Sequence, residues 1–87
     1  MDTYEVYLKR SVEKDLASIP TKDLLRILAR VRSLATNPRP SRCEKLEGQD
    51  RYRIRQGRYR IVYSIQDDEL TVCIAKVSHR KDAYRQW

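Results

Sequence analysis

Hydrophobic residues recur at two different spacings along this chain, and the spacing changes after residue 38. From Val12 to Ala35, apolar side chains return every three or four positions, which is typical of amphipathic helices. From residue 51 onward, apolar and polar side chains largely alternate, which is typical of strands with one buried face. After a short apolar segment at residues 4–8, the pattern therefore predicts a helical part followed by a sheet-forming part.

Two helices are predicted in the first part. One covers residues 12–19 with Ser11 as its N-cap, and the other covers residues 22–35 with Thr21 as its N-cap. Proline follows each segment. Because proline lacks a backbone N–H and restricts the residue before it, it ends a helix. The apolar stripe of each helix is available to cover one face of a sheet.

Four strands are predicted, at residues 4–8, 51–56, 59–65 and 70–77. Short turns join the last three, so these strands form an antiparallel meander. In the last strand, alternation predicts one face made of Leu70, Val72, Ile74 and Lys76. The order β-α-α-β-β-β predicts an α+β fold: a twisted antiparallel sheet with two helices packed on one face. A chain of 87 residues is expected to form a single domain, 1–87.

Arginines are concentrated on the predicted hairpin. Arg53 and Arg55 share one face of their strand, and Arg60 can lie beside them on the next strand. Like charges opposed across a sheet destabilise it by up to about 1 kcal/mol per pair, so an anion from outside the fold is expected to compensate. Because guanidinium groups match phosphate oxygens, the sheet predicts a phosphate-binding surface. The alternative is a charged face that is only solvated.

The overall composition points in the same direction. Lys and Arg total 19 against 12 Asp and Glu, which gives a net charge of +7 and an expected polyanionic or acidic partner. The two cysteines have no metal-binding spacing and are interpreted as reduced thiols of a cytosolic protein. We expect no signal peptide and no membrane span, because no apolar run approaches about 18–20 residues. The cytoplasm is the expected location.

The C-terminal segment carries further candidate chemistry. His79, the only histidine, stands between Ser78 and Arg80 at the end of the last predicted strand. Imidazole suits proton transfer near neutral pH, although a single histidine is often structural. Tyr84 is either a core aromatic or a ring that stacks on a nucleobase.

Four segments together resemble the RelE/ParE superfamily of bacterial and archaeal toxin–antitoxin toxins. They are YEVYLKRSVEKDLASIP at 4–20, KLEG at 45–48, YRIRQGRYRIVY at 52–63 and VSHRKDAY at 77–84. The resemblance implies a compact toxin of the RelE-like, microbial ribonuclease-type fold. RelE-type members cleave mRNA in the ribosomal A site, ParE-type members poison DNA gyrase, and an antitoxin that wraps across the toxin inactivates both.

The RelE branch is favoured by the residues that match its pattern, which are Arg53, Arg55, Arg60, Arg80 and Tyr84. The best-known RelE pattern has lysines at positions 53 and 55. Because arginine does not lose its proton in proteins, Arg53 and Arg55 are expected to bind phosphate and stabilise charge. Proton transfer would then fall to His79 or Tyr84.

The predicted function is a metal-independent endoribonuclease that has no cofactor. Catalytic roles are predicted for Arg60, Arg80, Tyr84 and His79, and RNA or phosphate binding for Arg53, Arg55, Lys45, Arg58 and Lys81. The predicted partners are mRNA, the ribosome and an acidic, partly disordered antitoxin in a hetero-oligomer. Two alternatives stay open: a gyrase inhibitor without nuclease activity, and a degenerate relative that only binds nucleic acid or antitoxin.

Overall fold

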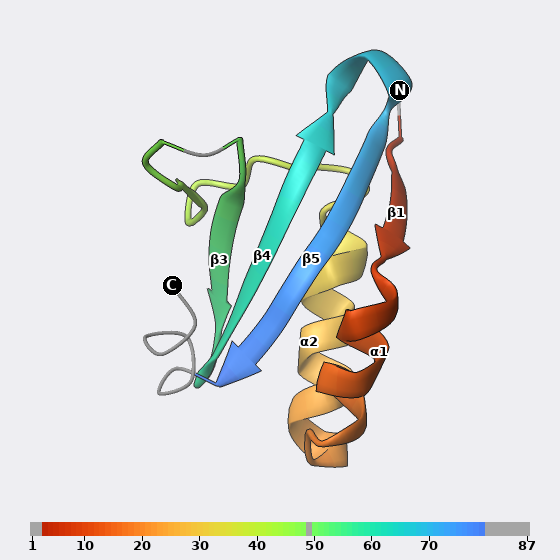
Figure 1. The fold of residues 1–87 in the computed structure, drawn as a ribbon, viewed down its shortest axis with the longest axis vertical. Coiled ribbons are helices and arrows are strands. Elements are labelled where there is room, and N and C mark those ends of the chain that lie inside the picture. The colour runs from red at the N-terminus through yellow and green to blue at the C-terminus, as the bar shows by residue number, and fades with distance from the viewer. Residues whose placement is uncertain (1–2, 49, 80–87) are drawn as a thin grey trace.

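The computed structural model describes residues 3–48 and 50–79. Its elements, in chain order, are β1 (Glu5–Leu8), α1 (Arg10–Ala17), α2 (Thr21–Ser33), β2 (Glu44–Lys45), β3 (Tyr52–Gln56), β4 (Tyr59–Gln66), the short 3₁₀ helix η1 (Asp67–Glu69) and β5 (Thr71–His79). The strands form one sheet in the order β1-β5-β4-β3-β2. In Figure 1, α2 passes behind β5 and α1 lies beside β5, and the buried side chains of both helices pack on one face of the sheet. The predicted α+β arrangement is confirmed.

Two details of the sheet differ from the predicted antiparallel meander. β1 pairs with β5 in parallel, so the sheet is mixed, whereas every other pair is antiparallel. A parallel pair requires a long connection, and the chain between β1 and β5 passes through both helices and β2–β4. The two-residue strand β2 was not predicted and adds a short edge beside β3.

α1 begins before its predicted cap, and α2 begins at its predicted cap. Ser11 lies inside α1, whose N-cap is Lys9, and Thr21 is the first residue of α2, whose N-cap is Pro20. Neither cap residue makes a side-chain hydrogen bond to the helix. The backbone N–H of Lys9 instead donates to the carbonyl of Ile74 at 3.1 Å, so the sheet fixes the chain where α1 starts.

The core lies between the helices and the covered face of the sheet. Its buried members are Val12, Ile19, Ile27, Val31, Leu34, Ile54, Ile61, Tyr63, Ile65, Val72, Ile74 and Val77. They come from the helical stripes and from one face of each long strand, as the two periodicities predict. The buried Tyr63 hydroxyl donates to the carbonyl of Pro38 at 2.8 Å, which ties the segment after α2 to the core.

One strand departs from simple alternation. The register of β4 with β5 shifts between Val62, which pairs with Lys76, and Tyr63, which pairs with Ile74. Ala75 is therefore an extra residue, as in a β-bulge. The prediction that Lys76 shares a face with Ile74 is wrong, because the bulge turns Lys76 to the opposite face and Val77 into the core.

A cluster of polar side chains joins segments that are far apart in the sequence. Arg39 binds both carboxylate oxygens of Asp67, at 3.0 and 2.8 Å, and its Nε donates to the Tyr52 hydroxyl at 3.1 Å. The Tyr4 hydroxyl also donates to Asp67, at 2.7 Å. The hydrogen bonds from Arg39 and then from Tyr4 lower the pKa of Asp67 to about 2. We call Arg39, Asp67, Tyr4 and Tyr52 the Asp67 cluster.

No helix among the described residues is long and apolar enough to cross a membrane.

Candidate nucleic-acid interface

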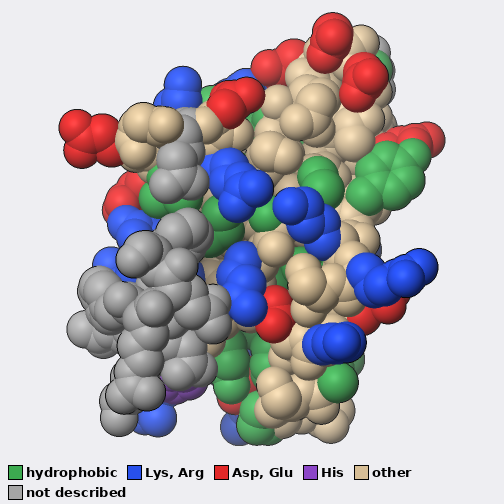
Figure 2. Space-filling model, in the orientation of Figure 1, with side chains coloured by type: hydrophobic (Ala, Val, Ile, Leu, Met, Phe, Trp, Pro, Cys, Tyr) green, Lys and Arg blue, Asp and Glu red, His purple; other side chains and the backbone are tan. Residues whose placement is uncertain are grey.

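Three arginines share the face of the sheet that the helices leave uncovered. Arg55 on β3 pairs directly with Arg60 on β4, and Arg53 pairs with Val62 two positions along. Because alternate residues of a strand point to the same side, all three side chains emerge on one face, as predicted. Figure 2 views this face and shows several Lys and Arg side chains over it. We call Arg53, Arg55 and Arg60 the arginine face.

The three arginines differ in exposure. Arg55 is exposed, the side chain of Arg53 keeps 25% of its accessible surface, and Arg60 is buried at 3%. Arg55 is therefore the most accessible guanidinium for an incoming anion. Arg60 is held more rigidly by its surroundings, since a buried side chain has few rotamers open to it.

A tight turn brings Arg55 and Arg60 opposite each other. β3 ends at Gln56 and β4 begins at Tyr59, so only Gly57 and Arg58 connect them. Gly57 has φ +60°, as the first central position of a type II′ hairpin turn requires, and glycine is the residue that adopts it most readily. Arg58 is exposed at this turn and adds a further cation to the end of the hairpin.

A carboxylate lies among these cations. Glu44 of β2 pairs with Arg53 in register, and Arg53 Nη2 lies 2.6 Å from its Oε2. The hydrogen bond and charge of Arg53, followed by the charges of Arg55 and Arg60, lower the pKa of Glu44. A cavity of about 250 Å³ is lined by Arg42, Glu44, Arg53 and Arg55. Neither Glu44 nor Arg42 was predicted as a site residue; their position just before KLEG was the available signal.

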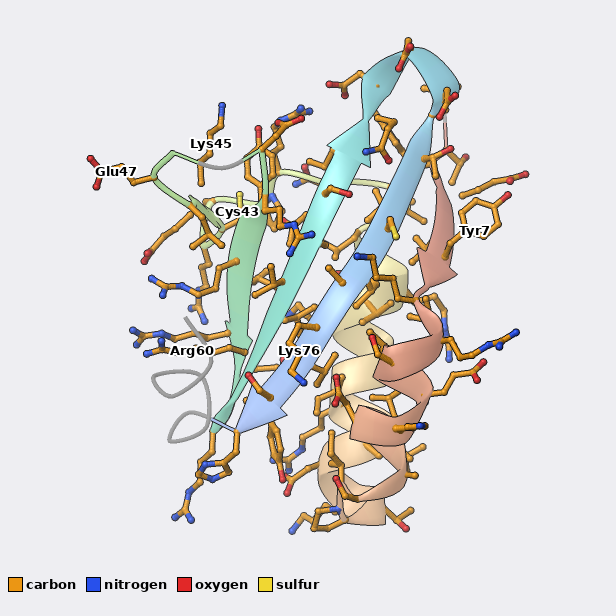
Figure 3. All side chains as sticks on the ribbon, in the orientation of Figure 1. Tyr7, Cys43, Lys45, Glu47, Arg60 and Lys76 are labelled. Carbon is orange, nitrogen blue, oxygen red and sulfur yellow. The ribbon has the colours of Figure 1, made fainter. Side chains whose placement is uncertain are left out.

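Two predicted site residues do not join the arginine face. Lys45 pairs with Tyr52, so it belongs to the other face of the sheet, and Figure 3 shows its side chain far from Arg60. His79 pairs with Tyr59, while its neighbour Ser78 pairs with Arg60. The imidazole packs edge-on against the Tyr59 ring, with 5.4 Å between centroids. His79 is thus at the end of the sheet, on the side opposite Arg60.

The remaining predicted residues, Arg80, Lys81 and Tyr84, lie outside the described residues, and their roles remain predictions. Within residues 3–48 and 50–79, no three of the His, Cys, Asp and Glu side chains are grouped as metal ligands. The arrangement that is described offers fixed positive charge, one ionised carboxylate and an open face. These groups can bind a phosphate backbone and stabilise negative charge on it.

Comparisons with known proteins identify the family. A family model described as the ParE toxin of the type II toxin-antitoxin system, parDE, matches residues 6–84. A protein of Methanocaldococcus jannaschii named as a candidate toxin, RelE1, is 33% identical over 86 residues, which cover 94% of this chain and 96% of that protein. Toxin RelG of Mycobacterium tuberculosis is 35% identical over 89 residues, which cover 95% of this chain and 98% of that protein.

A solved structure gives the same result. A chain of the archaeal RelE–RelB complex from Pyrococcus horikoshii superposes with a TM-score of 0.82 at 34% identity. The superposition covers 90% of this chain and 96% of that one. The chain described above therefore belongs to the ParE toxin family of type II toxin–antitoxin systems, within the RelE/ParE superfamily.

Proposed function

We propose that this toxin is a metal-independent endoribonuclease that cleaves mRNA. The observation that carries the proposal is the register of β3 and β4, which gathers Arg53, Arg55 and Arg60 on the uncovered face of the sheet. RNA supplies phosphates along its length, and arginine binds phosphate with two parallel hydrogen bonds. The resemblance to RelE-type toxins, which cleave mRNA on the ribosome, supports the same substrate.

The proposed reaction is an attack of the RNA on its own backbone. The 2′-oxygen bonds to the adjacent phosphorus, and the bond from phosphorus to the 5′-oxygen of the next nucleotide breaks. A base accepts the proton of the 2′-hydroxyl, and an acid gives a proton to the leaving 5′-oxygen. The products are a 2′,3′-cyclic phosphate and a free 5′-hydroxyl.

The arginines supply charge stabilisation in this scheme. Arg60, buried and therefore fixed in position, neutralises the phosphorane that forms at the reacting phosphate. The more accessible Arg55 and Arg53 bind flanking phosphates, and Arg58 at the turn extends the contact. Arg80 and Lys81, which follow β5 in the chain, are proposed to add to this charge.

Proton transfer needs groups other than arginine. Glu44 is ionised at neutral pH, as carboxylates ordinarily are, so it can accept the 2′-hydroxyl proton, although its neighbouring arginines lower its pKa and make it a weaker base. Tyr84 remains proposed as the donor to the leaving oxygen, whereas His79, the other predicted proton-transfer residue, lies on the side of the sheet opposite Arg60. Glu44 therefore supplies the base that the two arginine substitutions at positions 53 and 55 remove.

An antitoxin is proposed as the second partner. The toxin carries a net charge of +7, and Arg55 of the arginine face is exposed. The similar Pyrococcus horikoshii protein was solved as a RelE–RelB complex. An acidic antitoxin segment that covers the arginine face would exclude RNA by occupying the same cations. Cytoplasmic mRNA and the ribosome are the proposed targets of the free toxin.

The test is cleavage of a translated mRNA by the purified toxin and by Arg60→Ala. Loss of one preorganised donor to the reacting phosphate is expected to slow cleavage by about 100–1,000-fold. Arg60→Lys, which retains the charge but not the planar fork, is expected to recover only part of the rate. End-group analysis is expected to find 2′,3′-cyclic phosphate and 5′-hydroxyl ends, with or without a chelator.

Arg32→Ala is the matched control. Arg32 is an exposed arginine of α2, on the helical side of the sheet, so its removal is expected to leave the cleavage rate unchanged. Circular dichroism and thermal melting of each variant establish that it is folded. Equal cleavage by folded Arg60→Ala and by the unsubstituted toxin would end the assignment.

The family model itself favours one second candidate. It is described as a ParE toxin, and ParE-type members poison DNA gyrase. A gyrase poison predicts DNA damage signalling with intact transcripts when the toxin is expressed. A ribonuclease predicts arrest of translation with cut transcripts, so transcript integrity in the same cells separates the two.

A further inference from the structure

A lysine that the sequence pattern places with the core side chains lies instead beside the arginine face. The bulge at Ala75 pairs Lys76 with Val62, whose other neighbour in register is Arg53. Arg60 pairs with Ser78, two positions further along β5, so Arg60 and Lys76 are diagonal neighbours on one face. Such neighbours are separated by roughly 7–8 Å.

A carboxylate of α1 holds this lysine. Lys76 Nζ lies 3.1 Å from Oδ1 of Asp15, and the backbone N–H of Val77 donates to Oδ2 of the same carboxylate at 3.3 Å. Asp15 keeps only 16% of its side-chain surface and Lys76 keeps 30%. Asp15 therefore bridges α1 to the bulged part of β5, where β1 has already ended and no longer pairs.

The pair lines a cavity between the end of α1 and the end of β5. The cavity has a volume of about 340 Å³ and is lined by Asp15, Ser18, Ile19, Tyr59 and residues 76–79. Its polar lining consists of hydroxyls, the ion pair and the imidazole of His79. A strand of RNA lying across Arg55 and Arg60 toward β5 would reach Lys76 next.

We propose that Lys76 is a further phosphate-binding residue of this toxin and that Asp15 is its positioning residue. The inference rests on the proposed function, because the ligand is the RNA that the arginine face binds. An ammonium group has three donors, and Asp15 accepts from Lys76 at one of its oxygens. The other donors are available to the phosphate next to the one at Arg60.

The charge of Asp15 predicts the direction in which its substitution changes the affinity for RNA. Asp15 fixes Lys76 but also places a negative charge close to the bound phosphate. Replacement of Asp15 by asparagine retains an acceptor for the Val77 N–H and removes that charge. If Lys76 contacts phosphate, this substitution strengthens RNA binding. If Lys76 only ties β5 to α1, the substitution weakens the tie and leaves RNA binding unchanged.

The experiment measures binding of a single-stranded RNA in which every 2′-oxygen is methylated, since this probe cannot be cleaved by its own 2′-hydroxyl. Affinity is measured by fluorescence anisotropy between about 50 and about 200 mM salt, because the slope of log affinity against log salt counts the phosphates neutralised. The variants are Lys76→Gln, Lys76→Arg and Asp15→Asn. Lys14→Gln, an exposed neighbour of Asp15 on α1, is the matched control, and Arg55→Gln is the reference for the arginine face.

Lys76→Gln is expected to reduce the magnitude of the slope by about 0.7 and to weaken binding about three- to fivefold. Lys76→Arg restores both, because it keeps the charge. Asp15→Asn strengthens binding about two- to threefold, and Lys14→Gln changes nothing.

An unchanged slope for Lys76→Gln, in the presence of a reduced slope for Arg55→Gln, overturns the inference and leaves the arginine face in place. An unchanged slope for both variants overturns the inference together with the proposed RNA interface. A fall in thermal stability shared by Lys76→Gln and Asp15→Asn, without any change in slope, shows that the pair is only a tether and also overturns it.

Discussion

At the scale of single residues, Asp67 shows how side chains hold the loops of a small sheet. It accepts hydrogen bonds from Arg39 and from Tyr4, which lie on different segments of the chain. The same Arg39 guanidinium stands over the Tyr52 ring, 5.3 Å from its centroid. One carboxylate therefore joins the start of the chain, the segment after α2 and the turn before β5.

Acid is expected to release this cluster. The folded-state pKa of Asp67 is lowered to about 2 from a reference of 3.8, so its contribution to stability is fully present above about pH 4 and is lost as the pH falls toward 2. Asp67→Asn should therefore lose less stability across this range than the unsubstituted toxin. Urea unfolding at several pH values measures the difference, with Asp68→Asn of the same turn as control. Parallel stability curves for the toxin and Asp67→Asn would contradict the assignment.

Some residues of the site could be predicted from the sequence, and one could not. Alternation placed Arg53, Arg55 and Arg60 on one face correctly, because a tight turn at Gly57 leaves little freedom in the register of a hairpin. Glu44 was not predicted as part of the site, since a two-residue strand has no periodicity to detect. Its approach to Arg53 depends on the pairing of β2 with β3, which is a tertiary contact.

At the scale of elements, the bulge in β5 is the feature that sequence patterns concealed. Val72, Ile74 and Lys76 alternate without interruption, and nothing in that pattern marks Ala75 as an extra residue. The structure resolves the conflict by burying Val77 and turning Lys76 outward. The hydrophobic core decides the register here, because burying Lys76 would cost far more than an interrupted ladder. Helix boundaries shifted by only one or two residues, because proline and the apolar stripes constrain them.

The hairpin turn gives a test at the same scale. An added Cβ at Gly57 would have no atom within 4 Å, so the effect of a substitution is confined to the backbone at φ +60°. Gly57→Ala is expected to lower the free energy of unfolding by about 1–2 kcal/mol, the cost of the left-handed region for an L-residue. Gly57→Asn should cost less, because asparagine tolerates this region.

Denaturant unfolding at constant m-value measures both substitutions at Gly57. An alanine variant as stable as the original would show that the turn relaxes to another type. The less stable of the two variants is expected to cleave RNA more slowly, because the turn places Arg55 opposite Arg60.

At the scale of the whole molecule, charge divides the two sides of the sheet. The helices bury the apolar face, and the opposite face carries the three arginines, of which Arg55 is exposed. Figure 2 shows several Lys and Arg side chains on this face. The net charge of +7 accelerates encounters with polyanions, and the arrangement of charge decides where they bind. Composition alone predicted an anionic partner; the location of the face required the strand register.

The uneven distribution of charge should affect how fast the proposed antitoxin associates with the toxin. Association of the toxin with its cognate antitoxin is expected to slow about tenfold when salt is raised from about 50 to about 500 mM, because steering by exposed charges is screened. The double variant Arg55→Gln/Arg58→Gln should associate more slowly at low salt. The double variant Arg10→Gln/Arg32→Gln removes the same charge from exposed helical positions and should associate at nearly the original rate. Stopped-flow fluorescence provides the rates, and equal slowing by both variants would show that only net charge matters.

The parallel pairing of β1 with β5 has a consequence for how the toxin is made. β1, the first of the described strands, can pair only after β5, the last of them, inserts between β1 and β4. Contacts so distant in sequence form late and close slowly. A nascent chain whose fifth strand is still inside the ribosomal tunnel cannot complete its sheet. The incomplete nascent toxin would therefore be inactive toward the ribosome that is synthesising it, although the finished toxin is proposed to act on ribosomes.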